Sequence, residues 1–429
     1  MTTPQSALAE WRRFWFLPTA AALGYATSVI HVYAMGPFIE PLQQDFGWTR
    51  AQVSSGITIS AFISAVFCIP IGMLVDRIGP RRVALIGIVL ITSGYALLGT
   101  ATGGATNWVL LWVILAFGTL WVQATVWTSA VASRFEVSRG MALAVTLSGA
   151  SVAATVFPIL ATALIGAFGW RTAFMGMSGL WLALVFPMLL FCFRGAHDDI
   201  RRPGRHGAPH ATTTTNNAGP AKVLTGVSLG EGLRSATLYK LLIAAGLFSF
   251  TIIGAMVHFV PILTDGGADP MAAASMASLI GIFSIVGRLA TGMLLDRFPG
   301  HYVGAAACLL PICASALLLL DGTNPVSQSV AAIGLGLTLG AEVDVIAYLT
   351  TRHFGLKNFG ALYGALVMAL SMGTAFGPLA AGGVYDYFGS YAEFLLLATG
   401  LMTVSAISLL SLGHPPVLVQ AAAQSPSQG

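Results

Sequence analysis

Long apolar stretches, separated by short polar segments, fill most of the 429-residue chain. An α-helix needs about 20 apolar residues to cross the ~30 Å hydrocarbon core of a bilayer, so a stretch of that length predicts a membrane span. Twelve stretches meet this criterion, at about residues 15–38, 53–75, 82–102, 107–131, 140–167, 172–193, 239–264, 272–294, 302–321, 327–350, 360–382 and 390–412. We therefore expect an all-α polytopic membrane protein with twelve transmembrane helices.

Composition supports this prediction. Hydrophobic residues make up 56% of the chain and charged residues only 8%, whereas soluble domains carry roughly 25% charged residues. A water-soluble protein is therefore excluded. The first apolar stretch continues well beyond the core of a signal peptide, so we interpret it as the first membrane helix. No metal-ligand set and no nucleophile with a neighbouring base stands out, so we expect neither an enzyme nor a cofactor.

The basic residues predict the orientation, because Lys and Arg accumulate on the cytoplasmic side of a membrane. With the N-terminus inside, 17 of the 20 Lys and Arg residues fall in cytoplasmic segments. Arg50 and Arg171 then lie outside, and Arg288 is left within a helix. We expect a multi-pass plasma-membrane protein with both termini in the cytoplasm. The net charge of +4 reflects this topology and gives no reason to expect nucleic acid as a partner.

A repeat with a constant offset of 220 residues relates the two halves of the chain. The segment "GMLVDRIG" from Gly72 recurs as "GMLLDRFP" from Gly292. We expect an N-terminal six-helix bundle (1–193), a cytoplasmic linker (194–238) and a C-terminal six-helix bundle with a short tail (239–429). The linker is polar and rich in Gly, Pro and Thr, with a short surface helix near Ser228 to Ser235. Parallel repeats of this kind occur in secondary transporters, which bind substrate between the halves near the midplane.

The repeated segment also carries a family resemblance. "GMLVDRIGPRR" resembles the signature loop of the major facilitator superfamily, and "GMLLDRF" resembles its second copy. The resemblance implies the major facilitator fold, with two pseudo-symmetric six-helix bundles and a cytoplasmic gate held by charge pairs. Positive-inside anchoring is the simpler interpretation of the same charges. The motif residues are Gly72, Asp76, Arg77, Gly79, Arg81 and Arg82 in the first copy, and Gly292, Asp296 and Arg297 in the second.

Four further segments are similar to the monocarboxylate transporters and the oxalate:formate antiporters within that superfamily. They are "DFGWTRAQVSSG", "RGMALAVTLSGAS", "FGWRTAF" and "GRLATGMLLDR". This resemblance implies a secondary transporter that moves a small organic monocarboxylate across the bilayer with a proton. Exchange or efflux of organic anions is the alternative within the superfamily, and a non-transporting membrane sensor is the alternative outside transport.

Arg288, Glu342 and Asp344 lie well inside predicted spans of the C-terminal half, away from the span ends. The residues 220 positions earlier are uncharged, namely Cys68, Val122 and Ala124. Burying an ion in hydrocarbon is expensive, so charges kept in one half alone indicate a function in that half. Counting back from Asp296 and Arg352 at 1.5 Å per residue places Arg288 and Glu342 roughly 12 and 15 Å into the membrane, at similar depths.

Arg288 is the candidate for binding the substrate anion. Arginine has no realistic neutral form, and its planar fork matches a carboxylate. The "GRLATG" context matches Arg288 to the arginine of the eighth helix that binds substrate carboxylate in monocarboxylate transporters. The alternative is a permanent salt bridge from Arg288 to Glu342 or Asp344. Ser284 stands where proton-coupled members of the family often carry an aspartate. Oxalate-type members use a second cation in the eleventh helix, but no lysine follows Lys357 here. A single buried cation suits a substrate with one carboxylate.

Glu342 and Asp344 are the candidates for proton coupling, because desolvation favours the neutral form of a carboxyl group. Residues two apart point to different sides of a helix, so the two differ in role. Asp344 continues the line Gly336, Gly340, Asp344, Tyr348, which resembles a close-packed helix contact. Glu342 lies one turn after Thr338 and is the favoured proton carrier.

Further candidates for substrate binding are His31, His258 and Tyr348. A histidine can carry protons near neutral pH, although a hydrogen-bonded packing histidine is commoner. Other aromatic residues are candidates to line the cavity or to pack in the core: Tyr25, Tyr33, Trp121, Trp127 and Tyr363. Pro158 and Pro378 are expected to interrupt the fifth and eleventh helices.

Overall fold

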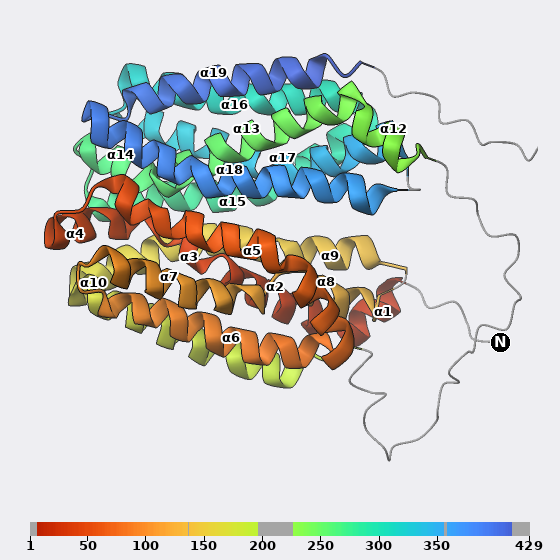
Figure 1. Ribbon diagram of the computed structural model, residues 1–429, viewed down its shortest axis with the longest axis horizontal. Coiled ribbons are helices and arrows are strands. Elements are labelled where there is room, and N and C mark those ends of the chain that lie inside the picture. Colours follow the sequence, from red (N-terminus) through yellow and green to blue (C-terminus); the bar gives the residue numbers. More distant parts are fainter. Residues whose placement is uncertain (1–6, 136, 196–225, 356–357, 414–429) are drawn as a thin grey trace, which may run out of the picture.

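The computed structural model describes residues 7–135, 137–195, 226–355 and 358–413, without the side chains of residues 7, 68–73 and 76. Helices form all the regular elements of this part of the chain (Figure 1). The N-terminal bundle contains α1 (Ala7–Phe14), α2 (Phe16–Ser28), α3 (Ile30–Tyr33), α4 (Gly36–Phe46), α5 (Arg50–Ile78), α6 (Pro80–Leu97), η1 (Leu98–Thr100), α7 (Ala105–Leu120), α8 (Ala124–Ala132), α9 (Arg139–Leu147) and α10 (Gly149–Cys192). The C-terminal bundle contains α12 (Leu229–Arg234), α13 (Ala236–Val257), α14 (Phe259–Asp265), α15 (Pro270–Arg297), α16 (Gly300–Asp321), α17 (Pro325–Phe354), α18 (Phe359–Phe388) and α19 (Ala392–Leu410).

The all-α membrane architecture is confirmed. Nine helical stretches of the described residues are long and apolar enough to cross a membrane. The longest, Arg139–Cys192, has 54 residues, which exceeds one crossing by far. It breaks at Gly169, where φ is 76° and ψ is 163°. The count of twelve spans stays a prediction.

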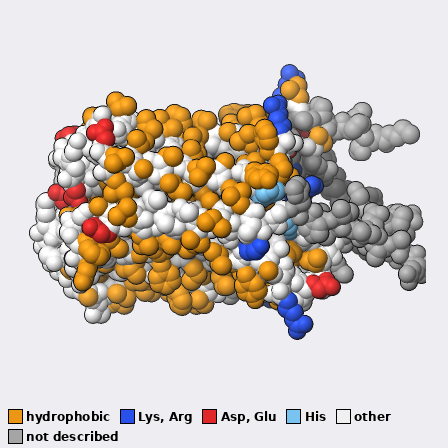
Figure 2. All heavy atoms as spheres, turned by 90° about the horizontal axis from the view of Figure 1, so that it is seen from above, with side chains coloured by type: hydrophobic (Ala, Val, Ile, Leu, Met, Phe, Trp, Pro, Cys, Tyr) orange, Lys and Arg blue, Asp and Glu red, His pale blue; other side chains and the backbone are white. Residues whose placement is uncertain are grey.

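The surface agrees with a membrane setting. Figure 2 shows apolar side chains covering the middle of the molecule, with acidic groups near one end and basic groups near the other. Exposed large apolar residues such as Leu110, Phe191 and Leu289 would contact water in a soluble protein. In a bilayer they face lipid, which removes the cost of exposing them. We call the two ends the Arg50 end, where α4, α14 and the start of α5 lie, and the linker end, where α1, α9 and α12 lie (Figure 1).

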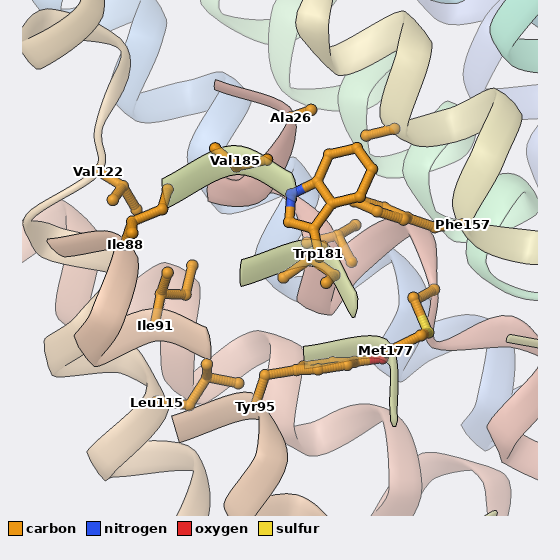
Figure 3. Packing of buried hydrophobic residues seen from close by; sticks show 14 of the residues in the cluster. Ala26, Ile88, Ile91, Tyr95, Leu115, Val122, Phe157, Met177, Trp181 and Val185 are labelled. Carbon is orange, nitrogen blue, oxygen red and sulfur yellow. Dashed lines mark hydrogen bonds between the residues drawn. The ribbon is translucent and has the colours of Figure 1, made fainter. Parts of the chain in front are cut away.

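Each bundle has its own apolar core. The N-terminal core includes Trp181, whose indole lies among Phe157, Val185 and Ala26 (Figure 3). The Trp181 Nε1–H donates to Thr27 Oγ1 at 2.7 Å, which satisfies its polar atom inside the core. The second core contains residues from each of the helices α13 to α19. The expected domain limits at residues 193 and 238 stay predictions.

The most extensive contacts between the bundles come from two pairs of helices. Helix α5 packs along α18, and α10 packs along α15. Ser284 on α15 donates to Ser151 Oγ on α10 at 2.6 Å. Thr58 on α5 donates to the carbonyl of Ala375 on α18. These contacts place α15 and α18 at the boundary between the bundles.

Short helices brace the linker end in both bundles. On α1, the Glu10 carboxylate accepts from the backbone N–H groups of Val137 and Ser138, at 3.0 Å each. In the C-terminal bundle the Val227 N–H, just before α12, donates to the Phe354 carbonyl at 3.0 Å. Helix α12 is the surface helix expected near Ser228 to Ser235, and a capping box from Ser228 and Glu231 starts it.

The prediction that proline interrupts two helices is wrong. Helix α10 continues through Pro158, and α18 continues through Pro378. Neighbouring helices in a membrane bundle compensate for the backbone hydrogen bond that a proline removes. The break in α10 lies eleven residues after Pro158, at Gly169. Glycine can adopt the positive φ of this break at little cost.

Glycines bring α17 and α15 into close backbone contact. A Cβ at Gly340 would overlap the carbonyl oxygen of Ser284, and one at Gly336 would overlap that of Ile280. A Cβ at Gly287 on α15 would meet the backbone of Leu337. The small-residue line expected on α17 therefore packs against α15, which carries Arg288.

We predict that Gly340→Ala lowers the free energy of unfolding by about 1–3 kcal/mol, because the added methyl group forces the two backbones apart. Gly364→Ala is the matched control, since a Cβ at Gly364 on α18 meets open space. Denaturant unfolding of the purified protein in detergent measures both. Equal stability of the two variants would contradict the close packing.

Candidate functional site

Arg288 and Asp344 face each other between α15 and α17. Arg288 Nη1 lies 3.6 Å from Asp344 Oδ1, with the side chains 19% and 32% exposed. This distance is within ion-pair range but too long for a hydrogen bond. Among the described residues, the buried Arg288 Nε–H has no hydrogen-bond partner either. The guanidinium therefore keeps donors that a further anion can use.

Glu342 lies deeper in the C-terminal bundle, with only 6% of its surface exposed. It interacts with the hydroxyl group of Ser249 on α13 and with the charge of Arg288. Thr338, one turn earlier, donates to the Ala307 carbonyl on α16, which fixes the direction of this face. Within the described part of the chain, Glu342 Oε1 accepts no hydrogen bond. The two acids therefore occupy different surroundings, as their spacing predicts.

Three tyrosines interact electrostatically with these charges. Tyr25 on α2 and Tyr33 on α3 come from the N-terminal bundle, and Tyr363 on α18 comes from the C-terminal bundle. Each interacts electrostatically with Arg288. Tyr363 also interacts with Asp344, and both Tyr33 and Tyr363 interact with Glu342. Phenol groups of both bundles therefore contribute to the electrostatics of one cation. The sequence marked all three only as general cavity candidates.

The remaining candidates for substrate binding lie elsewhere. His31 is buried in the N-terminal bundle, where its Nε2 is 3.2 Å from Ser60 Oγ and its ring packs edge-on against Trp112. Tyr348 packs against Gly300 at the start of α16, and its ring centroid is 6.0 Å from the Arg352 guanidinium carbon. These contacts place Tyr348 one turn beyond Asp344, toward the linker end.

His258 belongs to a junction between the bundles. It is fully buried, with Nδ1 at 2.6 Å from Tyr391 Oη and Nε2 at 2.9 Å from the Pro378 carbonyl. Ser54 Oγ of the other bundle lies 3.1 Å from Nε2. Both ring nitrogens thus have hydrogen-bond partners at the Arg50 end, and the ligand role of His258 stays a prediction.

The described motif residues lie toward the linker end. Gly79 has φ of 89°, and Arg81 donates to the Leu190 carbonyl at 2.6 Å. The structure leaves Gly72 and the Asp76 side chain outside its description. The other members, Arg77, Arg82, Gly292, Asp296 and Arg297, are exposed. The proposed gate role of these residues stays a prediction.

Sequence reasoning missed a charge cluster at the Arg50 end. Arg50, at the start of α5, donates to both oxygens of Asp265 in the other bundle, at 2.8 and 2.9 Å. It also donates to Tyr391 Oη at 2.7 Å. Asp45 pairs with Arg171 in the N-terminal bundle. The 220-residue offset places Asp265 and Tyr391 at the corresponding positions, so the sequence already showed that Asp265 lacks the corresponding arginine.

Comparison with known proteins decides the family. The family model described as "Major Facilitator Superfamily" matches residues 21–342, more than half of the chain. The chain belongs to the Major Facilitator Superfamily. This membership indicates a multi-pass membrane transporter, not an enzyme.

Its relatives in the superfamily carry different names. The chain is 28% identical to monocarboxylate transporter 13 of Rattus norvegicus, over 84% of this chain and 79% of that protein. It is 27% identical to a chloramphenicol resistance protein of Streptomyces lividans, over 82% of this chain and 88% of that protein. The solved nucleoside transporter NupG has the same fold, with a TM-score of 0.72, 12% identity, and coverage of 93% and 100% of the two chains.

Proposed function

We propose that this superfamily transporter moves a small organic monocarboxylate together with a proton by alternating access. The observation that carries the proposal is an arginine with unused donors beside two acids, on a helix that packs against the other bundle. Similarity to a protein named monocarboxylate transporter 13 supports the same substrate class. By the positive-inside rule, the linker end faces the cytoplasm and the Arg50 end faces outward.

Arg288 binds the substrate anion. A carboxylate accepts two parallel charge-assisted hydrogen bonds from a guanidinium, whereas Asp344 at 3.6 Å accepts none. The Asp344 carboxylate balances the Arg288 charge while the site is empty. A permanent, saturated salt bridge would show hydrogen-bonding distances, so the geometry favours the ligand role over the purely structural one. Tyr25, Tyr33 and Tyr363 supply hydroxyl groups and ring surfaces for the rest of the substrate.

Glu342 carries the proton. With both acids ionised, Arg288, Asp344 and Glu342 sum to one negative charge, and a bound substrate anion adds a second. Protonation of Glu342 removes one of these charges before the loaded site moves through the membrane. The proton binds at the carboxylate from the side that delivers the substrate and leaves on the other side. Coupling therefore follows from charge balance at a buried site.

Exchange or efflux is the second candidate function. The similarity to a protein named chloramphenicol resistance protein, at 27% identity, supports export as the alternative. An exchanger would carry an anion in each direction, so Glu342 would need no proton. Transport that persists without a pH gradient, and only when anion is present on both sides, would identify exchange.

We predict that Arg288→Gln lowers the rate of labelled monocarboxylate uptake by about 100-fold or more, since each charge-assisted hydrogen bond contributes ~1.5–3 kcal/mol. Uptake into proteoliposomes with an acidified exterior measures this rate for a panel of acids. Arg234→Gln serves as the control, because Arg234 is an exposed cation at the end of α12. Unchanged uptake by Arg288→Gln would remove the anion-binding role.

We further predict that Glu342→Gln transports without responding to a pH gradient, because an amide cannot release a proton. Asp344→Asn keeps the pH response and changes the KM for the acid, since it removes the counter-ion of Arg288. Proton-driven accumulation and counterflow, measured on the same vesicles, separate the two effects. Full proton-driven accumulation by Glu342→Gln would disprove its role as proton carrier.

A further inference from the structure

Arg50 makes almost all of its contacts with the opposite bundle. Its guanidinium holds Asp265 by two hydrogen bonds and Tyr391 Oη by a third. The guanidinium carbon lies 3.6 Å from the ring centroid of Tyr385, within cation–π range. From its own bundle, Gln43 accepts from Nε at 2.9 Å. The paired side chains of Arg50 and Asp265 are 6% and 34% exposed.

Asp386 on α18 strengthens the same junction. Its two carboxylate oxygens accept the backbone N–H groups of Arg50 and Ala51, at 2.8 Å each. These groups begin α5, where the helix dipole attracts negative charge. A side chain of one bundle thus caps a helix of the other. His258 continues the junction inward through Tyr391 and Ser54.

The repeat reveals what is unusual about Asp265. In the N-terminal bundle the corresponding Asp45 pairs with Arg171 of its own bundle at 3.1 Å, and both side chains are 46% exposed. In the C-terminal bundle Tyr391 replaces that arginine. A tyrosine hydroxyl cannot neutralise Asp265, so the positive charge comes from Arg50 across the boundary. One pseudo-symmetric ion pair has become an ion pair between bundles.

From this we propose that Arg50, Asp265, Tyr391 and Asp386 form a lock that closes the Arg50 end and must open for the bundles to separate there. The lock favours one conformation because it exists only when the bundles meet. Apart, Arg50 and Asp265 are solvated charges that gain little from their own bundles. A contact made in one state alone shifts the equilibrium between states by its whole free energy. The inference does not depend on the proposed substrate.

The distance between the bundles at this end tests the lock without any ligand. Nitroxide labels at Gln44 on α4 and Thr323 before α17 would report it by double electron–electron resonance, in nanodiscs and in a background with the four cysteines replaced by serine. Both positions are exposed. Unaltered protein is expected to show mainly the short distance.

Asp265→Asn is expected to raise the long-distance population about tenfold or more, because it removes a charge-assisted pair. Tyr391→Arg is expected to act in the same direction, since the introduced cation can pair with Asp265 inside its own bundle and release Arg50. Tyr391→Arg keeps the Asp265 carboxylate, so it still tests the lock if Asp265→Asn proves unstable.

Asp45→Asn is the matched control, because it breaks the corresponding pair within the N-terminal bundle. It is expected to leave the distance distribution unchanged. Unaltered distributions in both lock variants would overturn the proposal, and so would an equal shift in the control. Melting temperatures of all four proteins identify any loss of folding. Transport of a carboxylate plays no part in the readout, so failure here leaves the proposed function standing.

Discussion

The permanent charge of Arg288 is the constraint on which the site depends. A guanidinium cannot become neutral at physiological pH, and hydrocarbon cannot solvate it. The protein places it on α15, a helix at the boundary between the bundles, where Asp344 of α17 supplies negative charge at 3.6 Å without accepting a hydrogen bond from it. Glycines on α17 allow this approach, because α15 and α17 meet backbone to backbone at Gly336 and Gly340. Close packing and the proposed anion site thus involve the same helix pair.

A second cation between the bundles has the opposite surroundings. The donors of Arg50 are occupied by Asp265, Tyr391 and Gln43, and its chain is almost fully covered. Arg288 makes an ion pair too long for a hydrogen bond, whereas both terminal nitrogens and Nε of Arg50 hold protein acceptors. The first arrangement suits a binding site, and the second suits a structural contact that is made and broken. Both lie at the boundary where superfamily members move.

Sequence was sufficient for the fold class and for the three buried charges, because an ion in an apolar span is conspicuous wherever it lies. Counting residues back from Asp296 and Arg352 also predicted similar depths for Arg288 and Glu342. The sequence could not predict which residues on other helices contact these charges. The helices are apolar on all sides, so periodicity does not reveal which face is buried. The sequence therefore did not separate Tyr348 and His258, whose contacts lie with Arg352 and Tyr391, from Tyr25 and Tyr363, which interact electrostatically with Arg288. The Arg50 cluster was overlooked because Arg50 lies in a loop-flanking segment, outside every apolar stretch.

Binding of an acid compared with its uncharged amide tests the central claim most directly. Purified protein, titrated calorimetrically with a panel of monocarboxylates and their matched amides, is expected to bind at least one acid and to ignore its amide. Arg288→Gln is expected to lose that binding while remaining folded. Equal binding of acid and amide, or unchanged binding of the acid by Arg288→Gln, would contradict the account of Arg288 as the anion site.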